Sequence, residues 1–136
     1  YSLRHGVGRG LTAGFVFGLL QLLFDGAYAW GWQSMILDYL LAFTPLGLTG
    51  LFKGKMIPAT LVSCGLRFMV HYVVGATIWA EYMPETFFNM TMTTPWIYSA
   101  LYNGAYMLPD LVMIIVIFLL LQKTPLAPYF RGAKIM

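Results

Sequence analysis

The chain has 136 residues, of which 60% are hydrophobic and 10% are charged, and its mean hydropathy is +0.73. A soluble domain carries about 25% charged residues, so the composition indicates a polytopic membrane protein. The net charge is +3, but the eight Lys and Arg residues form no concentrated patch, which argues against nucleic-acid binding. The single cysteine, Cys64, lies in an apolar stretch and allows neither an intramolecular disulfide nor a cysteine-based metal site.

Four apolar stretches approach the length of about 20 residues that a helix needs to cross a bilayer. We expect transmembrane helices at residues 11–25, 34–52, 57–82 and 95–122. The first stretch is short, so flanking residues or neighbouring helices must complete it. The sequence therefore predicts an all-α polytopic protein of the cell membrane, built as a bundle of four helices in the lipid bilayer.

Local signals mark the ends and irregularities of these helices. Ser34 is a candidate N-cap of the second helix, which has Pro45 in its interior. Pro58 suits the first turn of the third helix, and Pro95 opens the fourth. Pro109 is expected to kink the fourth helix, because proline interrupts the backbone hydrogen bonds.

Basic residues alternate between the two sides of the predicted helices. Two precede the first helix, two follow the second and three follow the fourth, whereas the other two loops have none. Loops rich in Lys and Arg stay in the cytoplasm, so this pattern predicts that both termini are cytoplasmic. The outer loops carry Asp25, Glu81 and Glu85, an anionic surface that favours the approach of a cation, weakly and with strong salt dependence.

The predicted third helix, although apolar, carries polar side chains between residues 65 and 79. Arg67, His71 and Trp79 are spaced by four and eight, which places them on one slowly turning ridge. Gly75 leaves a notch on that ridge for a flat ligand or another backbone. Ionisable residues inside a membrane helix are by default candidates for a functional site. The alternative is structural: an arginine paired with a carboxylate of another helix and a histidine hydrogen-bonded in the core.

Besides Asp25 and Glu81 at the ends of predicted helices, two carboxylates lie within them. Arg67 lies about 15 Å from the cytoplasmic end of its helix and Asp110 about 21 Å from the outer end of the fourth. The two depths coincide, and an unpaired buried charge is unfavourable, so we expect an Arg67–Asp110 ion pair. Asp38, one turn into the second helix, is either a solvated helix-start carboxylate or an acceptor for an amino group or cation. Tyr39 adds a hydroxyl beside it.

The fourth helix carries two sets of polar residues. Asn103 and Asp110 are spaced by seven and share a face, and Asn103 offers both a donor and an acceptor. Tyr98 lies about 140° from Asn103 on an ideal helix, so helical geometry alone does not group the two. Tyr98, Tyr102 and Tyr106 form a separate stripe, which we interpret as packing.

Motifs of catalysis do not occur in the sequence. It contains no G-x-S-x-G, no H-E-x-x-H and no Walker-type glycine loop. Asp38 and Asp110 lie at different expected depths, which argues against a paired-aspartate mechanism. The two histidines, His5 and His71, lie in separate regions, so a metal site is not predicted. We therefore expect neither an enzyme nor a bound cofactor.

Three long stretches, taken together, resemble a known family. They are residues 34–52 (SMILDYLLAFTPLGLTGLF), residues 66–85 (LRFMVHYVVGATIW, then EYMPE after Ala80) and residues 95–110 (PWIYSALYNGAYMLPD). The opening RGLTAG at residues 9–14 also fits. In this order they resemble the thiamine-specific substrate-binding subunit (S component, ThiT family) of energy-coupling factor transporters, over nearly the whole chain.

The resemblance implies high-affinity capture of thiamine from outside. Release inward then involves a coupling transmembrane subunit and two ATPase subunits, which hydrolyse the ATP. It also implies that residues 1–136 are the C-terminal part of a single six-helix S-component domain that lacks its N-terminal helices. By matching motifs, it assigns ligand binding to Asp38, Tyr39, Arg67, His71, Trp79, Tyr98, Asn103 and Tyr28.

These residue types suit thiamine, which has a positively charged thiazolium ring and a flat aminopyrimidine. Trp79 and His71 offer faces for stacking, and an aromatic face attracts a cation. Asp38 can accept from the exocyclic amine or balance the charge, while Asn103 and Tyr98 can pair with ring nitrogen and hydroxyl groups. The alternatives are an S component for another vitamin or small cation, or a membrane scaffold that binds no ligand.

Overall fold

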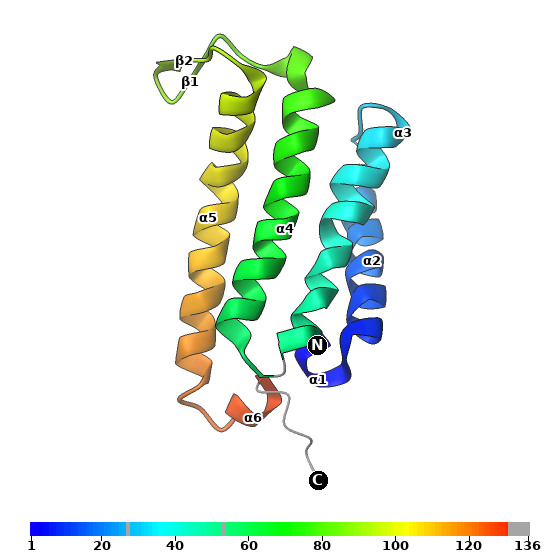
Figure 1. The fold of residues 1–136 in the computed structure, drawn as a ribbon, viewed down its shortest axis with the longest axis vertical. Coiled ribbons are helices and arrows are strands. Elements are labelled where there is room, and N and C mark those ends of the chain that lie inside the picture. Colours follow the sequence, from blue (N-terminus) through cyan, green and yellow to red (C-terminus); the bar gives the residue numbers. More distant parts are fainter. Residues whose placement is uncertain (27, 53, 131–136) are drawn as a thin grey trace.

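Four helical segments dominate the computed structural model, which describes residues 1–26, 28–52 and 54–130. Each is long and apolar enough to cross a membrane, which confirms the predicted all-α membrane fold. They are α2 (Val7–Phe24), the segment Gly31–Phe52, α4 (Met56–Thr77) and α5 (Pro95–Leu121). The four run side by side along the long axis of the molecule (Figure 1).

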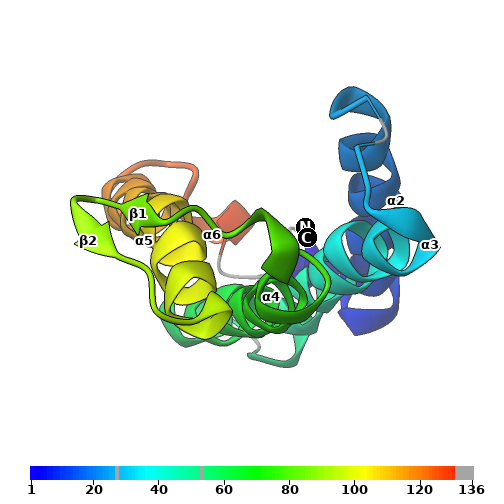
Figure 2. The same ribbon diagram turned by 90° about the horizontal axis from the view of Figure 1, so that it is seen from above.

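Viewed from above, the four segments form a curved row (Figure 2). The row begins with α2, continues through Gly31–Phe52 and α4, and ends with α5. Many large apolar side chains of α5 are exposed, and only 6% of its most apolar window is buried. Such a surface is stable in contact with lipid rather than with water, as a multi-pass membrane protein requires.

Short elements lie between the long helices or beyond the first and the last of them. They are α1 (Ser2–His5), η3 (Ala80–Tyr82), β1 (Thr86–Phe87), β2 (Met90–Thr91) and α6 (Ala127–Phe130). The strands β1 and β2 pair as an antiparallel hairpin at the end of the bundle opposite α1 and α6 (Figure 1). The sequence predicts only a loop there, and α4 ends at Thr77 rather than at the predicted residue 82. Lys53, Arg131 and Lys134, used to predict orientation, lie outside the described residues.

The second membrane segment departs from a regular α-helix. It consists of α3 (Gly31–Ser34), the π-helical η1 (Met35–Leu41) and the 3-10 helix η2 (Thr44–Phe52). Pro45 has no N–H to donate, and its ring would clash with the carbonyl four residues earlier in an α-helix. One residue earlier, the hydroxyl of Thr44 donates to the carbonyl of Leu40 at 2.6 Å. The proline therefore accounts for the loss of α-helical pairing at this point.

Ser34 is not the N-cap of this segment, as the sequence analysis predicted. The helix begins earlier, at Gly31, and the backbone of Ser34 is already helical. Its side chain is completely buried and donates to Asp38, one turn further along, at 2.9 Å. The hydroxyl thus serves a carboxylate inside the bundle rather than the backbone at a helix end.

The helix α2 contacts the second segment backbone to backbone. A Cβ atom on Gly14 would lie 2.7 Å from the carbonyl oxygen of Phe43, and one on Gly18 would overlap the carbonyl of Tyr39. Only glycine permits so close an approach. We refer to this contact as the glycine seam. It holds in place the stretch of backbone that carries Tyr39 and Phe43.

Polar side chains join α4 to α5. The hydroxyl of Ser99 donates to the carbonyl of Tyr72 at 2.8 Å, and a Cβ atom on Gly75 would overlap that hydroxyl. The amide of Asn103 donates to the carbonyl of His71 at 3.3 Å. We refer to this contact as the polar clamp. The predicted notch at Gly75 therefore accommodates a neighbouring helix.

Candidate ligand-binding cavity

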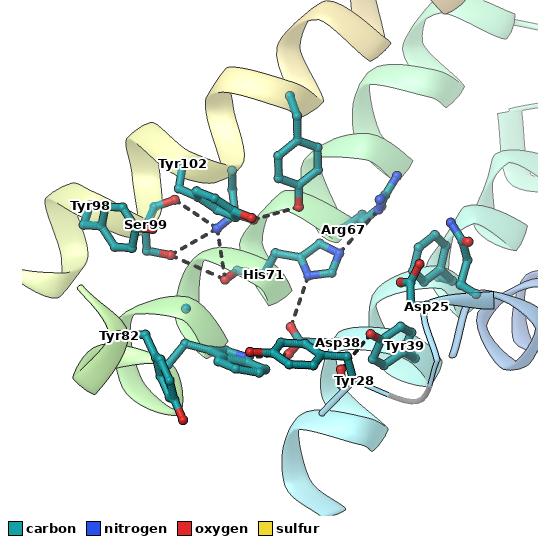
Figure 3. Close-up of a pocket in the computed structure, with 16 residues that line it drawn as sticks. Asp25, Tyr28, Asp38, Tyr39, Arg67, His71, Tyr82, Tyr98, Ser99 and Tyr102 are labelled. Atoms are coloured by element: carbon teal, nitrogen blue, oxygen red, sulfur yellow. Dashed lines mark hydrogen bonds and ion pairs between the residues drawn. The ribbon is translucent and has the colours of Figure 1, made fainter. Parts of the chain in front are cut away.

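A cavity of about 470 Å³ lies among α2, η1, α4 and α5, and Figure 3 shows its lining side chains. The end of α2, the second segment, α4 and α5 all contribute to it, although they are far apart in the sequence. All eight side chains that the sequence analysis assigned to ligand binding line this one cavity: Tyr28, Asp38, Tyr39, Arg67, His71, Trp79, Tyr98 and Asn103. The fold thus brings the whole predicted set together.

Asp38 is the centre of the hydrogen bonds in this cavity. Its Oδ2 accepts from the hydroxyl of Ser34 at 2.9 Å and from Nε1 of Trp79 at 2.8 Å, and its Oδ1 lies 3.2 Å from Nδ1 of His71. The carboxylate side chain is 15% exposed, so the alternative of a freely solvated helix-start group is wrong. Hydrogen bonds to a carboxylate are about twice as strong as neutral ones, and three partners hold this one.

Arg67 and His71 extend this network deeper into the bundle. The Nε atom of Arg67 donates to Nε2 of His71 at 3.4 Å. Because Nε2 accepts, the imidazole proton is assigned to Nδ1, which donates to Asp38. His71 is then neutral and connects a guanidinium to a carboxylate. The guanidinium also lies 4.4 Å from the centre of the Phe43 ring, a favourable cation–π contact.

The predicted ion pair between Arg67 and Asp110 is wrong. Arg67 turns toward His71 and the Phe43 ring, whereas Asp110 lies exposed on α5. Among the described residues, the contact within 4.0 Å between a basic side chain and a carboxylate is that of His71 Nδ1 with Asp38 Oδ1, at 3.2 Å. Two groups at one expected depth meet only when they also face each other. The aromatic ring and the imidazole give Arg67 its partners instead.

Aromatic side chains form one wall of the cavity. Tyr28 stacks on Trp79 with ring centres 5.7 Å apart and planes at 18°, and Tyr82 lies 5.6 Å from the same indole. The hydroxyl of Tyr39 donates to the carbonyl of Tyr28 at 2.8 Å, which ties this wall to η1. Offset aromatic rings at such distances leave flat faces that suit a planar ligand.

The wall formed by α5 is polar and already hydrogen-bonded. The amide nitrogen of Asn103 donates to the carbonyl of Ser99 at 2.9 Å and to the carbonyl of His71 at 3.3 Å. Its Oδ1 accepts from the hydroxyl of Tyr106 at 2.8 Å. Asn103 is 5% exposed. Since one lone pair of Oδ1 accepts from Tyr106, one lone pair is left for a ligand. Asn103 therefore orients this wall as well as lining it.

Eight further residues line the cavity that the sequence analysis did not assign to the site: Gln21, Asp25, Phe43, Gly75, Tyr82, Ser99, Tyr102 and Tyr106. The interpretation of the tyrosine stripe as packing is wrong, because its three members all line the cavity. The three are spaced by four and so share one helix face, which was the available sign that Tyr102 and Tyr106 would line the site together with Tyr98. Gln21 and Phe43 gave no comparable signal, since each belongs to an apolar stretch.

Comparison with known proteins identifies the family. The model of the thiamine transporter protein family (Thia_YuaJ) matches residues 1–128. The chain belongs to this family. It is 32% identical to the thiamine transporter ThiT of Bacillus subtilis, over 90% of the chain and 69% of that protein. It is 28% identical to the thiamine transporter ThiT of Lacticaseibacillus paracasei, over 85% of the chain and 64% of that protein.

Family membership confirms the resemblance found in the motifs around Asp38, His71 and Asn103. It places the chain among transporters rather than enzymes, and it agrees with four membrane-spanning segments. The matches cover about two thirds of the length of these relatives.

Proposed function

We propose that the chain binds thiamine from the outer side of the membrane, as the substrate-specificity subunit of an energy-coupling factor importer. The observation that carries the proposal is the gathering of eight motif-assigned residues around one cavity. Membership of a thiamine transporter family supports the identity of the ligand. The volume of about 470 Å³ falls in the range of small-molecule sites.

Each part of the cavity suits one part of thiamine. The rings of Tyr28 and Trp79 provide flat faces for a stacked heterocycle, and Asp38 provides lone pairs for an exocyclic amine. Tyr98 and the free lone pair of Asn103 face the cavity from α5. The neutral imidazole of His71 completes the contact surface. Binding here requires no cofactor, and the energy for transport is supplied by ATP hydrolysis in partner subunits.

The proposal includes the assembly and the orientation. Residues 1–136 belong to a single S-component domain in the cell membrane, whose partners are a coupling transmembrane subunit and two ATPase subunits. Both termini of this chain face the cytoplasm, which the alternation of basic residues between the spans supports. The aromatic end of the cavity then opens outward.

The direct test is a titration of the intact protein in lipid nanodiscs, followed by tryptophan fluorescence. Thiamine should quench the emission saturably, because Trp79 lines the cavity. Riboflavin and biotin serve as competing vitamins. A variant with Trp96→Phe is the matched control, since Trp96 is exposed and does not line the cavity, and it should respond as the wild type does. Quenching by another vitamin but not by thiamine overturns the proposal.

Replacing Trp79→Ala should weaken thiamine binding by about 1–3 kcal/mol, the scale of one lost stacking contact. The change also removes a donor to Asp38, so the loss should lie toward the upper end. Isothermal titration calorimetry measures this without relying on the removed fluorophore. Unchanged affinity would remove Trp79 from the site, and unchanged affinity on Asp38→Ala as well would place the thiamine site outside this cavity. A wild type that binds neither thiamine nor another vitamin would favour a scaffold that binds no ligand.

A further inference from the structure

A second carboxylate faces the cavity from the end of α2. Asp25 directly follows the last residue of that helix, and its N–H donates to the carbonyl of Gln21 at 2.9 Å. Both residues line the cavity, and Figure 3 shows Asp25 on the side of Tyr39. The side chain of Tyr39 interacts with the carboxylates of both Asp25 and Asp38. Asp25 is thus part of the same site, at its exposed edge.

The two carboxylates differ in how far their charge is compensated. Asp38 accepts three hydrogen bonds, and neutral His71 connects it to the guanidinium of Arg67. Among the described residues, the carboxylate of Asp25 has no basic partner within 4.0 Å, and its side-chain partner is the neutral hydroxyl of Tyr39. Of the residues that line the cavity, two are acidic and one is basic, so the cavity carries a net charge of −1. The uncompensated charge lies at Asp25.

The position of Asp25 in its helix adds to this imbalance. The C-terminal end of a helix carries a partial negative charge, so a carboxylate there is repelled rather than stabilised. No basic residue lies in the last turn of α2 to offset the repulsion. A cation bound in the cavity relieves it. The negative charge of Asp25 is therefore unfavourable for the end of α2 and favourable for a positively charged ligand.

We propose that Asp25 is the counter-charge for a singly positive ring of the ligand, whereas Asp38 acts as a hydrogen-bond acceptor. This assignment rests on the proposed thiamine function, because thiamine supplies one fixed positive charge and a neutral aminopyrimidine. It makes Asp25 the residue that distinguishes charged from uncharged ligands of the same shape. Because Asp25 is exposed, water screens the attraction, and the effect on affinity is about three- to tenfold.

The test compares two ligands on three variants of the intact protein in nanodiscs. The ligands are thiamine and a neutral analogue in which carbon replaces the quaternary ring nitrogen. Asp25→Asn should weaken thiamine binding about three- to tenfold and change binding of the analogue by less than about twofold. Asp38→Asn should weaken both ligands. Glu81→Gln is the matched control, an exposed carboxylate of η3 outside the cavity, and should affect neither.

Salt gives a second readout that needs only thiamine. Raising the ionic strength should weaken wild-type binding, and Asp25→Asn should remove most of that dependence. Equal losses for both ligands, an unchanged affinity for thiamine, or the same loss with Glu81→Gln each overturn the role of Asp25. Failure of the wild type to bind thiamine overturns the proposed function and this inference with it. If the wild type binds thiamine and the Asp25→Asn variant binds it equally well, the inference is overturned and the proposed function stands.

Discussion

The glycine seam and the polar clamp join neighbouring helices by opposite means. At the glycine seam, Gly14 and Gly18 meet backbone carbonyls directly. At the polar clamp, Gly75 meets the hydroxyl of a side chain, Ser99, which is itself hydrogen-bonded across the contact. A backbone carbonyl inside a helix has nowhere to move, whereas a serine side chain can be changed or removed. The two contacts should therefore respond differently to the same added methyl group.

The largest effect is expected from Gly18→Ala at the glycine seam. The new Cβ atom overlaps the carbonyl of Tyr39, so α2 must move away from η1, and we expect a destabilisation of about 3 kcal/mol or more. Thermal unfolding in detergent measures it. Gly8→Ala in the same helix is the matched control, because no atom lies within 4 Å of its added Cβ. Equal stability of the two variants would contradict the close contact.

A smaller effect, which a second substitution should partly rescue, is expected at the polar clamp. Gly75→Ala overlaps the hydroxyl of Ser99 and should cost about 1–3 kcal/mol of stability. Adding Ser99→Ala removes that obstacle, so the double variant should be more stable than Gly75→Ala alone. A double-mutant cycle of melting temperatures measures the coupling. Simple additivity of the two changes would show that the hydroxyl is not what fills the notch.

The smallest effect is expected from Ser34→Ala, which touches neither contact. It removes one of three donors to Asp38 without adding volume, and should weaken thiamine binding by about 0.5–1.5 kcal/mol. Stability should change far less than with Gly18→Ala. Calorimetric titration measures the affinity, and Ser34→Thr, which keeps the hydroxyl, is the comparison. An alanine variant that binds as tightly as the wild type would remove Ser34 from the support of Asp38.

The sequence predicted the fold well because hydropathy over 20 residues depends on composition alone. It did not predict the π-helical turn of η1, because Pro45 signals that the helix is interrupted but not how the chain accommodates it. The hairpin was missed for a similar reason. Its turn residues, Phe88 and Asn89, both have positive φ, a conformation usually signalled by glycine.

The lining of the cavity was predictable where a sequence motif contained the residue, and not where the packing of the helices determined it. Asp38, His71 and Trp79 came from matched motifs, and the structure gathers them in one cavity. The partner of Arg67 was wrong because helical depth constrains only one coordinate of a side chain. Asp25 was noticed as an outer-loop charge, but its place in the cavity depends on where α2 ends relative to η1, which periodicity does not define.

The carboxylate of Asp38 lies where the two helix pairs meet. It belongs to the second segment, which the glycine seam fixes to α2, yet Trp79 and His71 belong to the side that the polar clamp fixes to α5. If the pair formed by α2 and the second segment moves away from the pair formed by α4 and α5, both hydrogen bonds to Asp38 lengthen at once. Ligand binding at Asp38 and the distance between the two helix pairs are therefore coupled. A change in either one alters the other.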